Sequence, residues 1–317
     1  MNTTGYFTHK DCWKHEMGPG HPECPERLDA IEDRLLISGV GDALQRREAP
    51  LAAIGDIELA HERMMIAAIR GLGDQLADDI RAGGPPYVQI DPDTAMNVHT
   101  WNAALRAVGA VIAATDCVMA GEMENAFCAV RPPGHHAEHN KAMGFCFFNN
   151  IAIAAKYALE RHGLKRVAIV DFDVHHGNGT EDIIRGDERI LMTSFFQHPF
   201  FPHTGADTRE SNMVNLPVPA YTKGMDIREL IEIMWIPRLE AFKPEMIFIS
   251  AGFDAHREDD MGQMNLNEQD YAWITERVKN VARRHAGGRI VSSLEGGYNF
   301  SALGRSVEAH IRVLADL

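Results

Sequence analysis

Two carboxylates and two imidazoles follow directly after an apolar run in the segment VAIVDFDVHHGNGTEDI, residues 167–183. Charged groups are costly to bury unless they are paired or bind a metal, so packing does not explain them. Asp173 and His175 stand two residues apart and therefore point to the same face of an extended segment. With Asp254, from SAGFDAH, they form an Asp-His-Asp set with room for water, which is typical of a catalytic metal site. Oxygen and nitrogen ligands without sulfur accept Zn²⁺, and also Fe²⁺, Co²⁺ or Mn²⁺.

A second group of residues could transfer protons beside such a metal. His135 and His136 stand in RPPGHHAEHNKAMGF, where HHAEH matches the H-x-x-E-H pattern of inverted zinc proteases. That motif requires a helix, whereas RPPG before it and Gly144 after it indicate a loop, so we favour an acid–base role for both imidazoles. Asp171 and Asn178 are available to orient them through their other ring nitrogens.

Aromatic residues in glycine- or proline-containing loops are candidates for a pocket wall. Tyr298 follows two glycines in LEGGY, which let the backbone turn and aim the phenol as a donor to an oxyanion. Phe145 in GFCFF and Phe201 in PFFPHTG each stand beside glycine or proline in a loop. This placement favours the walls of a narrow channel over a position in the core.

The residues that could do chemistry are far apart in the sequence and need a scaffold that brings them together. We expect strands at 126–130, 165–173, 189–196, 245–254 and 289–298. We expect helices at 24–38, 58–72, 100–121, 148–163, the short GTEDIIRG segment, 224–244 (kinked or shortened by Pro237), 267–288 and 302–314. The alternation predicts a single α/β domain, residues 1–317, with a predominantly parallel multi-stranded sheet and helices on both faces. Ligands of such sheets bind at the C-terminal ends of the strands, where these residues fall.

Composition excludes several classes of partner. The 31 Lys and Arg residues against 45 Asp and Glu give a net charge of −14, and no basic run occurs, so we expect no direct nucleic-acid binding. The N-terminus lacks the features of a signal peptide and no uninterrupted apolar stretch approaches transmembrane length, so we expect no membrane binding. Five cysteines without a C-x-x-C pair indicate reduced thiols and a cytoplasmic protein.

The assembled motifs resemble those of the histone deacetylase family, within the arginase/deacetylase superfamily. The resemblance extends from GHPECPERL (20–28) through RPPGHHA, GFCFFNN, DFDVHHGNGT and SAGFDAH to LEGGYN (294–299). HPECPERL and Asn178, where class I members carry Asp, are similar to the class II branch, which includes bacterial histone deacetylase-like amidohydrolases. The resemblance implies the arginase/deacetylase fold and a zinc-dependent amidohydrolase that removes acetyl or acyl groups from the ε-amine of acyl-lysine.

The resemblance also implies roles for the residues singled out above. It implies one catalytic Zn²⁺ bound by Asp173, His175 and Asp254. His136 would be the general base and acid, oriented by Asn178. Its neighbour His135, paired to Asp171, would give electrostatic support, and Tyr298 would bind the oxyanion.

For a further set of residues, the resemblance alone implies a role in the substrate channel or in binding potassium. Gly144, Phe145 and Phe201 would line the substrate channel, and Asp93, in IDPDTAM, matches a rim carboxylate that holds the substrate backbone. A structural K⁺ would be bound by Asp171, Asp173, His175 and Ser194. Met261 stands where polyamine-selective relatives carry an acidic residue, which weakly favours acyl-lysine, although Glu258, Asp259 and Asp260 make the loop acidic.

Several alternatives remain open from the sequence. The substrate is either acyl-lysine in a peptide or protein, or a small acylated amine such as an acetylpolyamine. A metalloprotein that binds acyl-lysine without cleaving it is disfavoured by Tyr298 and by the complete histidine pair. A ureohydrolase needs a binuclear manganese site, and only one full ligand set is visible. A homo-oligomer also remains open.

Overall fold

The strands that precede the histidine pair, the predicted metal ligands and Tyr298 lie at the centre of one sheet. In the computed structural model, which describes residues 3–317, eight strands pair in parallel in the order β2-β1-β5-β10-β9-β6-β7-β8. Their bounds are β1 Thr4–Thr8, β2 Leu44–Glu48, β5 Asn125–Cys128, β6 Val167–Asp171, β7 Ile190–Gln197, β8 Met213–Val218, β9 Met246–Ala251 and β10 Ile290–Leu294. A separate antiparallel pair joins β3 (Val88–Gln89) and β4 (Ala95–Met96).

The five strands expected from the sequence are present, each with slightly different bounds. Every residue of β5, β6, β7, β9 and β10 is buried, which explains why these strands read as continuous apolar runs. The sequence interpretation missed three strands of the large sheet and the short β3–β4 pair. β1 has the sequence TGYFT, with two threonines and a glycine, and β2 is an edge strand with mostly exposed side chains. β8 contains Pro217, which is tolerated at the other edge of the sheet.

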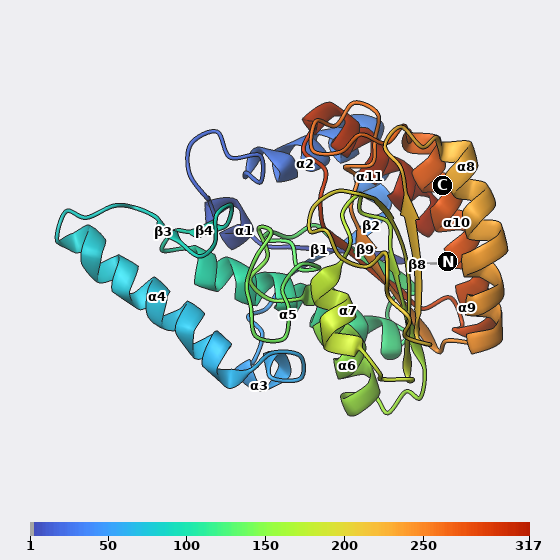
Figure 1. Cartoon of the computed structure of the whole chain (residues 1–317), viewed down its shortest axis with the longest axis horizontal. Helices are drawn as coiled ribbons and strands as arrows, with labels where there is room; N and C mark the ends of the chain where they lie inside the picture. Colours follow the sequence, from blue (N-terminus) through green and yellow to red (C-terminus); the bar gives the residue numbers. More distant parts are fainter. Residues whose placement is uncertain (1–2) are drawn as a thin grey trace.

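Helices cover both faces of the sheet, as predicted (Figure 1). The helices α5 and α6 pack on β1, β5, β6, β9 and β10, whereas α2, α8, α9, α10 and α11 pack together on the other side. The long helices are α2 Glu26–Ser38, α4 Arg63–Arg81, α5 Thr100–Met119, α6 Asn150–Arg161, α10 Glu268–His285 and α11 Phe300–Leu314. The shorter helices are α1 Asp11–Lys14, η1 Val40–Ala43, α3 Ile54–Ile57, α7 Asn178–Ile184, α8 Gly224–Leu230, η2 Ile231–Trp235 and α9 Ile236–Phe242.

Two helices differ from their sequence-based expectations by more than a small shift of their ends. The helix expected at 58–72 is α4, which begins later and extends to Arg81, and Figure 1 shows it reaching away from the sheet. The helix expected at 224–244 is continuous but contains a π-turn, η2, just before Pro237. Proline has no N–H to donate to the preceding turn, so the hydrogen-bond register of the helix changes there.

Helix α5 departs from the expectation that no apolar stretch approaches transmembrane length. Among the described residues it is the one helix that is long and apolar enough to span a membrane by length and composition. Of the window that meets this test, 67% is buried inside the protein, against α1, α6 and three strands. A buried core helix passes the same test, so the apolar composition of α5 is explained by its packing.

Candidate active site

The three predicted metal ligands lie together at the C-terminal ends of neighbouring strands. Asp173 and His175 follow β6, and Asp254 follows β9. One ligand atom from each lies within 4.8 Å of the others, and all three side chains are buried. His175 Nδ1 lies 3.0 Å from Asp173 Oδ1 and 3.2 Å from Asp254 Oδ2. The predicted set of ligands therefore exists as a spatial cluster.

Glycines allow the backbone to approach this cluster closely. A Cβ atom on Gly252 would lie 2.0 Å from Asp173 Oδ2, and a Cβ atom on Gly296 would lie 2.0 Å from Asp254 Oδ2. Gly296 instead donates its N–H to Asp173 Oδ2 over 2.8 Å. Any larger residue at these two positions would displace the carboxylates.

The electrostatics of the cluster fit a bound cation. Asp254 Oδ2 is buried and makes no well-formed hydrogen bond, and the donor His175 Nδ1 lies 3.2 Å from it. Burial and the nearby Asp173 raise the pKa of Asp254 to about 7. Two carboxylates buried side by side are stabilised in their charged form by a cation between them. A donor set of two carboxylates and one imidazole suits zinc and similar divalent ions.

The two loop histidines lie beside the predicted metal ligands and contact different side chains through Nδ1. His135 Nδ1 lies 3.0 Å from Asp171 Oδ2, and His136 Nδ1 lies 2.8 Å from Asn178 Oδ1. Burial opposes a charge on His135, but Asp173 and Asp171 raise its pKa to about 10. Burial and the nearby imidazoles of His135 and His175 lower the pKa of His136 well below its usual value. One ring is therefore stabilised as a cation, and the other as a neutral base.

A narrow channel of about 250 Å³ leads to the histidines and contains the predicted wall residues. It is lined by Asp93, His136, Gly144, Phe145, His175, Phe200, Phe201, Asp260, Met261 and Tyr298. Phe201 lies edge-on to His136 with ring centroids 5.1 Å apart. Phe200, which the sequence interpretation missed, stacks on His175 at 5.4 Å and 15°. The two phenylalanines thus shield the imidazoles from solvent.

The opposite wall is formed by residues in constrained backbone conformations. Gly144 and Phe145 both have positive φ, and a Cβ on Gly144 would lie 2.6 Å from the ring of His136. The ring of Phe145 lies 6.0 Å from that of Tyr298 and 4.7 Å from that of His21, edge-on in both cases. Gly144 is therefore required where the loop passes over His136.

Tyr298 is held by contacts to its backbone and its ring. Its N–H donates to Asp259 Oδ2 over 2.6 Å, and Arg27 lies over its ring, 4.8 Å from the centroid. Arg27 Nε also donates to Gly297 O over 2.7 Å. Burial raises the pKa of Tyr298 well above its usual value, so the phenol stays protonated and can donate a hydrogen bond.

A buried ionic network behind Tyr298 was not recognised as functional from the sequence. Glu23 accepts hydrogen bonds from Arg27 and from two nitrogens of Arg131, and all three side chains are fully buried. His15 Nε2 lies 3.5 Å from the same carboxylate. Two of these residues, Glu23 and Arg27, belong to HPECPERL, and their opposite charges four residues apart were the available signal.

Glu295 was also missed, although it stands in the LEGGY motif. Its Oε2 accepts the N–H groups of Gly134 (2.7 Å) and His135 (3.1 Å), so it clamps the histidine loop to the end of β10. Its Oε1 is buried without a hydrogen-bond partner, and burial raises its pKa to about 7.

The remaining residues singled out from the sequence lie along the channel or beside the predicted metal ligands. Asp93 and Met261 line the channel, together with Asp260. Asp171 and Ser194 are register partners in β6 and β7, beside the metal cluster. The K⁺ site therefore remains a prediction.

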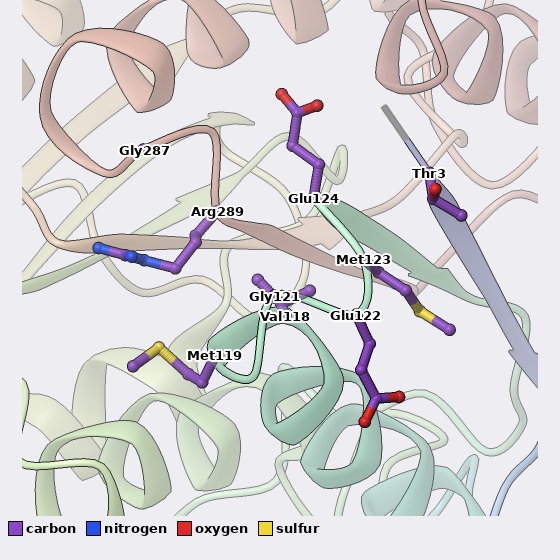
Figure 2. Close-up of a pocket in the computed structure, with 9 residues that line it drawn as sticks. All are labelled: Thr3, Val118, Met119, Gly121, Glu122, Met123, Glu124, Gly287 and Arg289. Atoms are coloured by element: carbon purple, nitrogen blue, oxygen red, sulfur yellow. The ribbon is translucent and has the colours of Figure 1, made fainter. Parts of the chain in front are cut away.

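A larger hollow lies at the opposite end of the sheet and has a different character. It has a volume of about 500 Å³ and is lined by residues just before β1, β5 and β10, including Glu122, Glu124 and Arg289. Figure 2 shows the side chains of Glu122 and Glu124 pointing in opposite directions, and the lining residues include no histidine or cysteine. The groups that could do chemistry are concentrated in the channel.

Comparisons with known proteins agree with the geometry. The histone deacetylase domain model matches residues 21–314. The chain is 36% identical to a histone deacetylase-like amidohydrolase of Pseudomonas aeruginosa, over 93% of this chain and 82% of that protein. It is 36% identical to a probable deacetylase of Archaeoglobus fulgidus, over 93% and 81% of the two chains.

Two further matches point to the same family. Type-2 histone deacetylase 2 of Dictyostelium discoideum is 42% identical over 71% of this chain, which spans only 14% of that longer protein. The crystal structure of the HDA15 HD domain superposes with a TM-score of 0.90 at 32% identity, covering 100% of this chain and 90% of the other. The chain therefore belongs to the histone deacetylase family.

Proposed function

We propose that the protein is a zinc-dependent amidohydrolase that removes acetyl or acyl groups from the ε-amine of acyl-lysine. The proposal rests on the observation that His136, His175 and Tyr298 all line the same channel. A flexible, largely apolar acyl-lysine side chain fits a narrow channel with aromatic walls, and its amide would reach the polar end.

The residues of the channel have complementary chemical tasks. Asp173, His175 and Asp254 would hold the zinc ion, which when bound polarises the scissile carbonyl and makes water a better nucleophile. His136 accepts the proton of the attacking water at Nε2 and returns it to the leaving amine. The Tyr298 hydroxyl donates to the carbonyl oxygen as negative charge develops there. His135, charged beside Asp171, adds electrostatic stabilisation.

A small acylated amine such as an acetylpolyamine is the second candidate substrate. Asp93 and Asp260 both line the channel, and no Lys or Arg lines it, which favours a substrate that carries a positive charge. Met261, an apolar residue in the same lining, favours acyl-lysine. A structural K⁺ bound near Asp171 and Ser194 and a cytoplasmic location are further parts of the proposal.

Metal analysis combined with turnover tests the proposal. The protein, loaded with Zn²⁺, is assayed against acetyl-lysine peptides, longer acyl-lysines and acetylpolyamines, with and without a chelator. We expect about one zinc per chain and chelator-sensitive release of the acyl group. Binding of acyl-lysine without turnover would instead support the non-catalytic alternative, and turnover confined to acetylpolyamines would reverse the order of the two substrates.

A further inference from the structure

Glu138, in the HHAEH segment, has no role in the mechanism above, yet it contacts Asn178, the partner of the general base His136. Glu138 Oε1 lies 2.7 Å from Asn178 Nδ2, and Asn178 Oδ1 lies 2.8 Å from His136 Nδ1. Glu138 is half-buried, whereas Asn178 and His136 are buried. The three side chains therefore form a chain that runs from the solvent boundary to the general base.

The contact with Glu138 decides which way the amide of Asn178 points. A carboxylate has no hydrogen to donate, so it accepts from the NH₂ group and would repel the amide oxygen at this distance. The second hydrogen of Nδ2 has Met143 Sδ as a weak acceptor at 3.4 Å. The reversed amide would place its oxygen against both acceptors. The orientation with Oδ1 toward His136 is therefore strongly favoured.

The orientation of this amide in turn decides the tautomer of His136. Because Asn178 Oδ1 can only accept, the hydrogen of the neutral imidazole must reside on Nδ1. Nε2 is then the unprotonated nitrogen. A reversed amide would favour the other tautomer, in which the nitrogen facing the channel could not accept a proton. A single flip of the amide would thus disable the base.

The backbone of Glu138 is fixed independently of its side chain. Its N–H donates to Lys141 O over 2.9 Å, and its carbonyl accepts from His61 Nδ1 over 2.9 Å. His61 Nε2 accepts the N–H of Asn149 over 2.8 Å, and burial lowers the pKa of His61 to about 4, so this ring is neutral. The loop is therefore held in place when the carboxylate alone is changed.

From these contacts we infer that Glu138 is a positioning residue, which orients the Asn178 amide and thereby holds His136 in the Nδ1–H tautomer. The inference rests on the proposed function, because it assigns the base that Glu138 serves. It predicts coupling between positions 138 and 178. Position 138 must supply an acceptor when residue 178 is an amide, and a donor when residue 178 is a carboxylate.

Four variants test the coupling by steady-state kinetics on the best substrate. Glu138→Gln retains a carbonyl acceptor and should keep kcat within about threefold, whereas Glu138→Leu should lower kcat roughly 10- to 100-fold with little change in KM. Asn178→Asp alone places two carboxylates in contact and should lower kcat similarly. The double variant Glu138→Gln/Asn178→Asp should recover most of that loss, because the glutamine amide can donate to the aspartate.

A matched control and a second readout separate positioning from folding. Glu62→Leu is the same substitution at an exposed residue on the segment next to this loop, and it should leave kcat unchanged. Histidine ¹⁵N spectra, assigned with His136→Asn, should show Nδ1 protonated in the wild type and Glu138→Gln, and a shifted or mixed tautomer in Glu138→Leu.

The outcomes distinguish this inference from the proposed function. Wild-type kcat and tautomer in Glu138→Leu, or no recovery in the double variant relative to Asn178→Asp, would overturn the role of Glu138 alone. A wild-type protein that hydrolyses no acyl amine would overturn the proposed function. The tautomer spectra would still decide whether Glu138 orients the amide in that case.

Discussion

The rings of His135 and His136 lie 4.0 Å apart between centroids, yet their Nδ1 atoms meet partners of different charge. His135 faces the carboxylate of Asp171, and His136 faces the neutral amide of Asn178. This asymmetry assigns a charged supporting role to the first ring and a proton-accepting role to the second.

Asp171→Asn tests that asymmetry. The substitution removes the negative charge that stabilises a positive His135, so we expect kcat to fall by roughly one to two orders of magnitude. Steady-state kinetics measure the loss, and Asp78→Asn on the exposed face of α4 serves as the control. An unchanged kcat would show that a charged His135 is unnecessary.

Tyr298→Phe removes the hydroxyl while keeping the ring under Arg27. Because the hydroxyl would bind the carbonyl oxygen mainly as charge develops, kcat should fall by roughly two orders of magnitude or more with little effect on KM. If turnover persists at the wild-type rate, Tyr298 has no part in the reaction.

Asp254→Asn should abolish tight metal binding, because it replaces one of the two carboxylates in the buried ligand set with a neutral amide. We expect less than one zinc per chain by elemental analysis, and no rise in Tm when zinc is added. The wild type should lose its zinc-dependent rise in Tm on treatment with a chelator. Full zinc occupancy in the variant would contradict the assigned ligand set.

Two substitutions at Glu295 separate hydrogen bonding from charge. Glu295→Gln keeps an oxygen that can accept from Gly134 and His135, whereas Glu295→Leu leaves both buried N–H groups without an acceptor. Each unsatisfied group costs about 1–3 kcal/mol, so the leucine variant should be markedly less stable to denaturant than the glutamine variant. Equal stability of the two variants would refute the clamp.

Stability should decrease with acid partly because of His310, a histidine that does not line the channel. His310 lies buried between the hydroxyls of Thr275 and Ser292, and burial lowers its pKa to about 3. Below pH 6.5 the unfolded chain binds a proton that folded His310 does not, so stability falls as pH decreases from 6.5 toward 3. At pH 5 the free energy of unfolding is lower by about 2 kcal/mol than above pH 6.5, as a result of this one histidine. Denaturant titrations of the wild type and His310→Gln should show a shallower decrease in the variant.

Periodicity and motif content were sufficient to predict the central strands of the sheet and the placement of the site at their C-terminal ends. Buried parallel strands are locally recognisable as apolar runs, and their polar continuations must meet at one edge. Asp173, His175 and Asp254 were therefore predictable as a cluster, and they lie within 4.8 Å of one another. The edge strands β2 and β8 were missed because partial exposure and Pro217 weaken the apolar signal.

Contacts between loops that are distant in the sequence could not be predicted and became visible only in the tertiary structure. Glu295 reaches the amides of Gly134 and His135 across 160 or more residues, and Arg27 reaches Gly297 across 270. Such hydrogen bonds have no periodic signature, because they depend on the path of each loop after its strand and not on local composition. Local pattern thus specified which groups reach the site, while long-range packing specified which atoms of those groups meet.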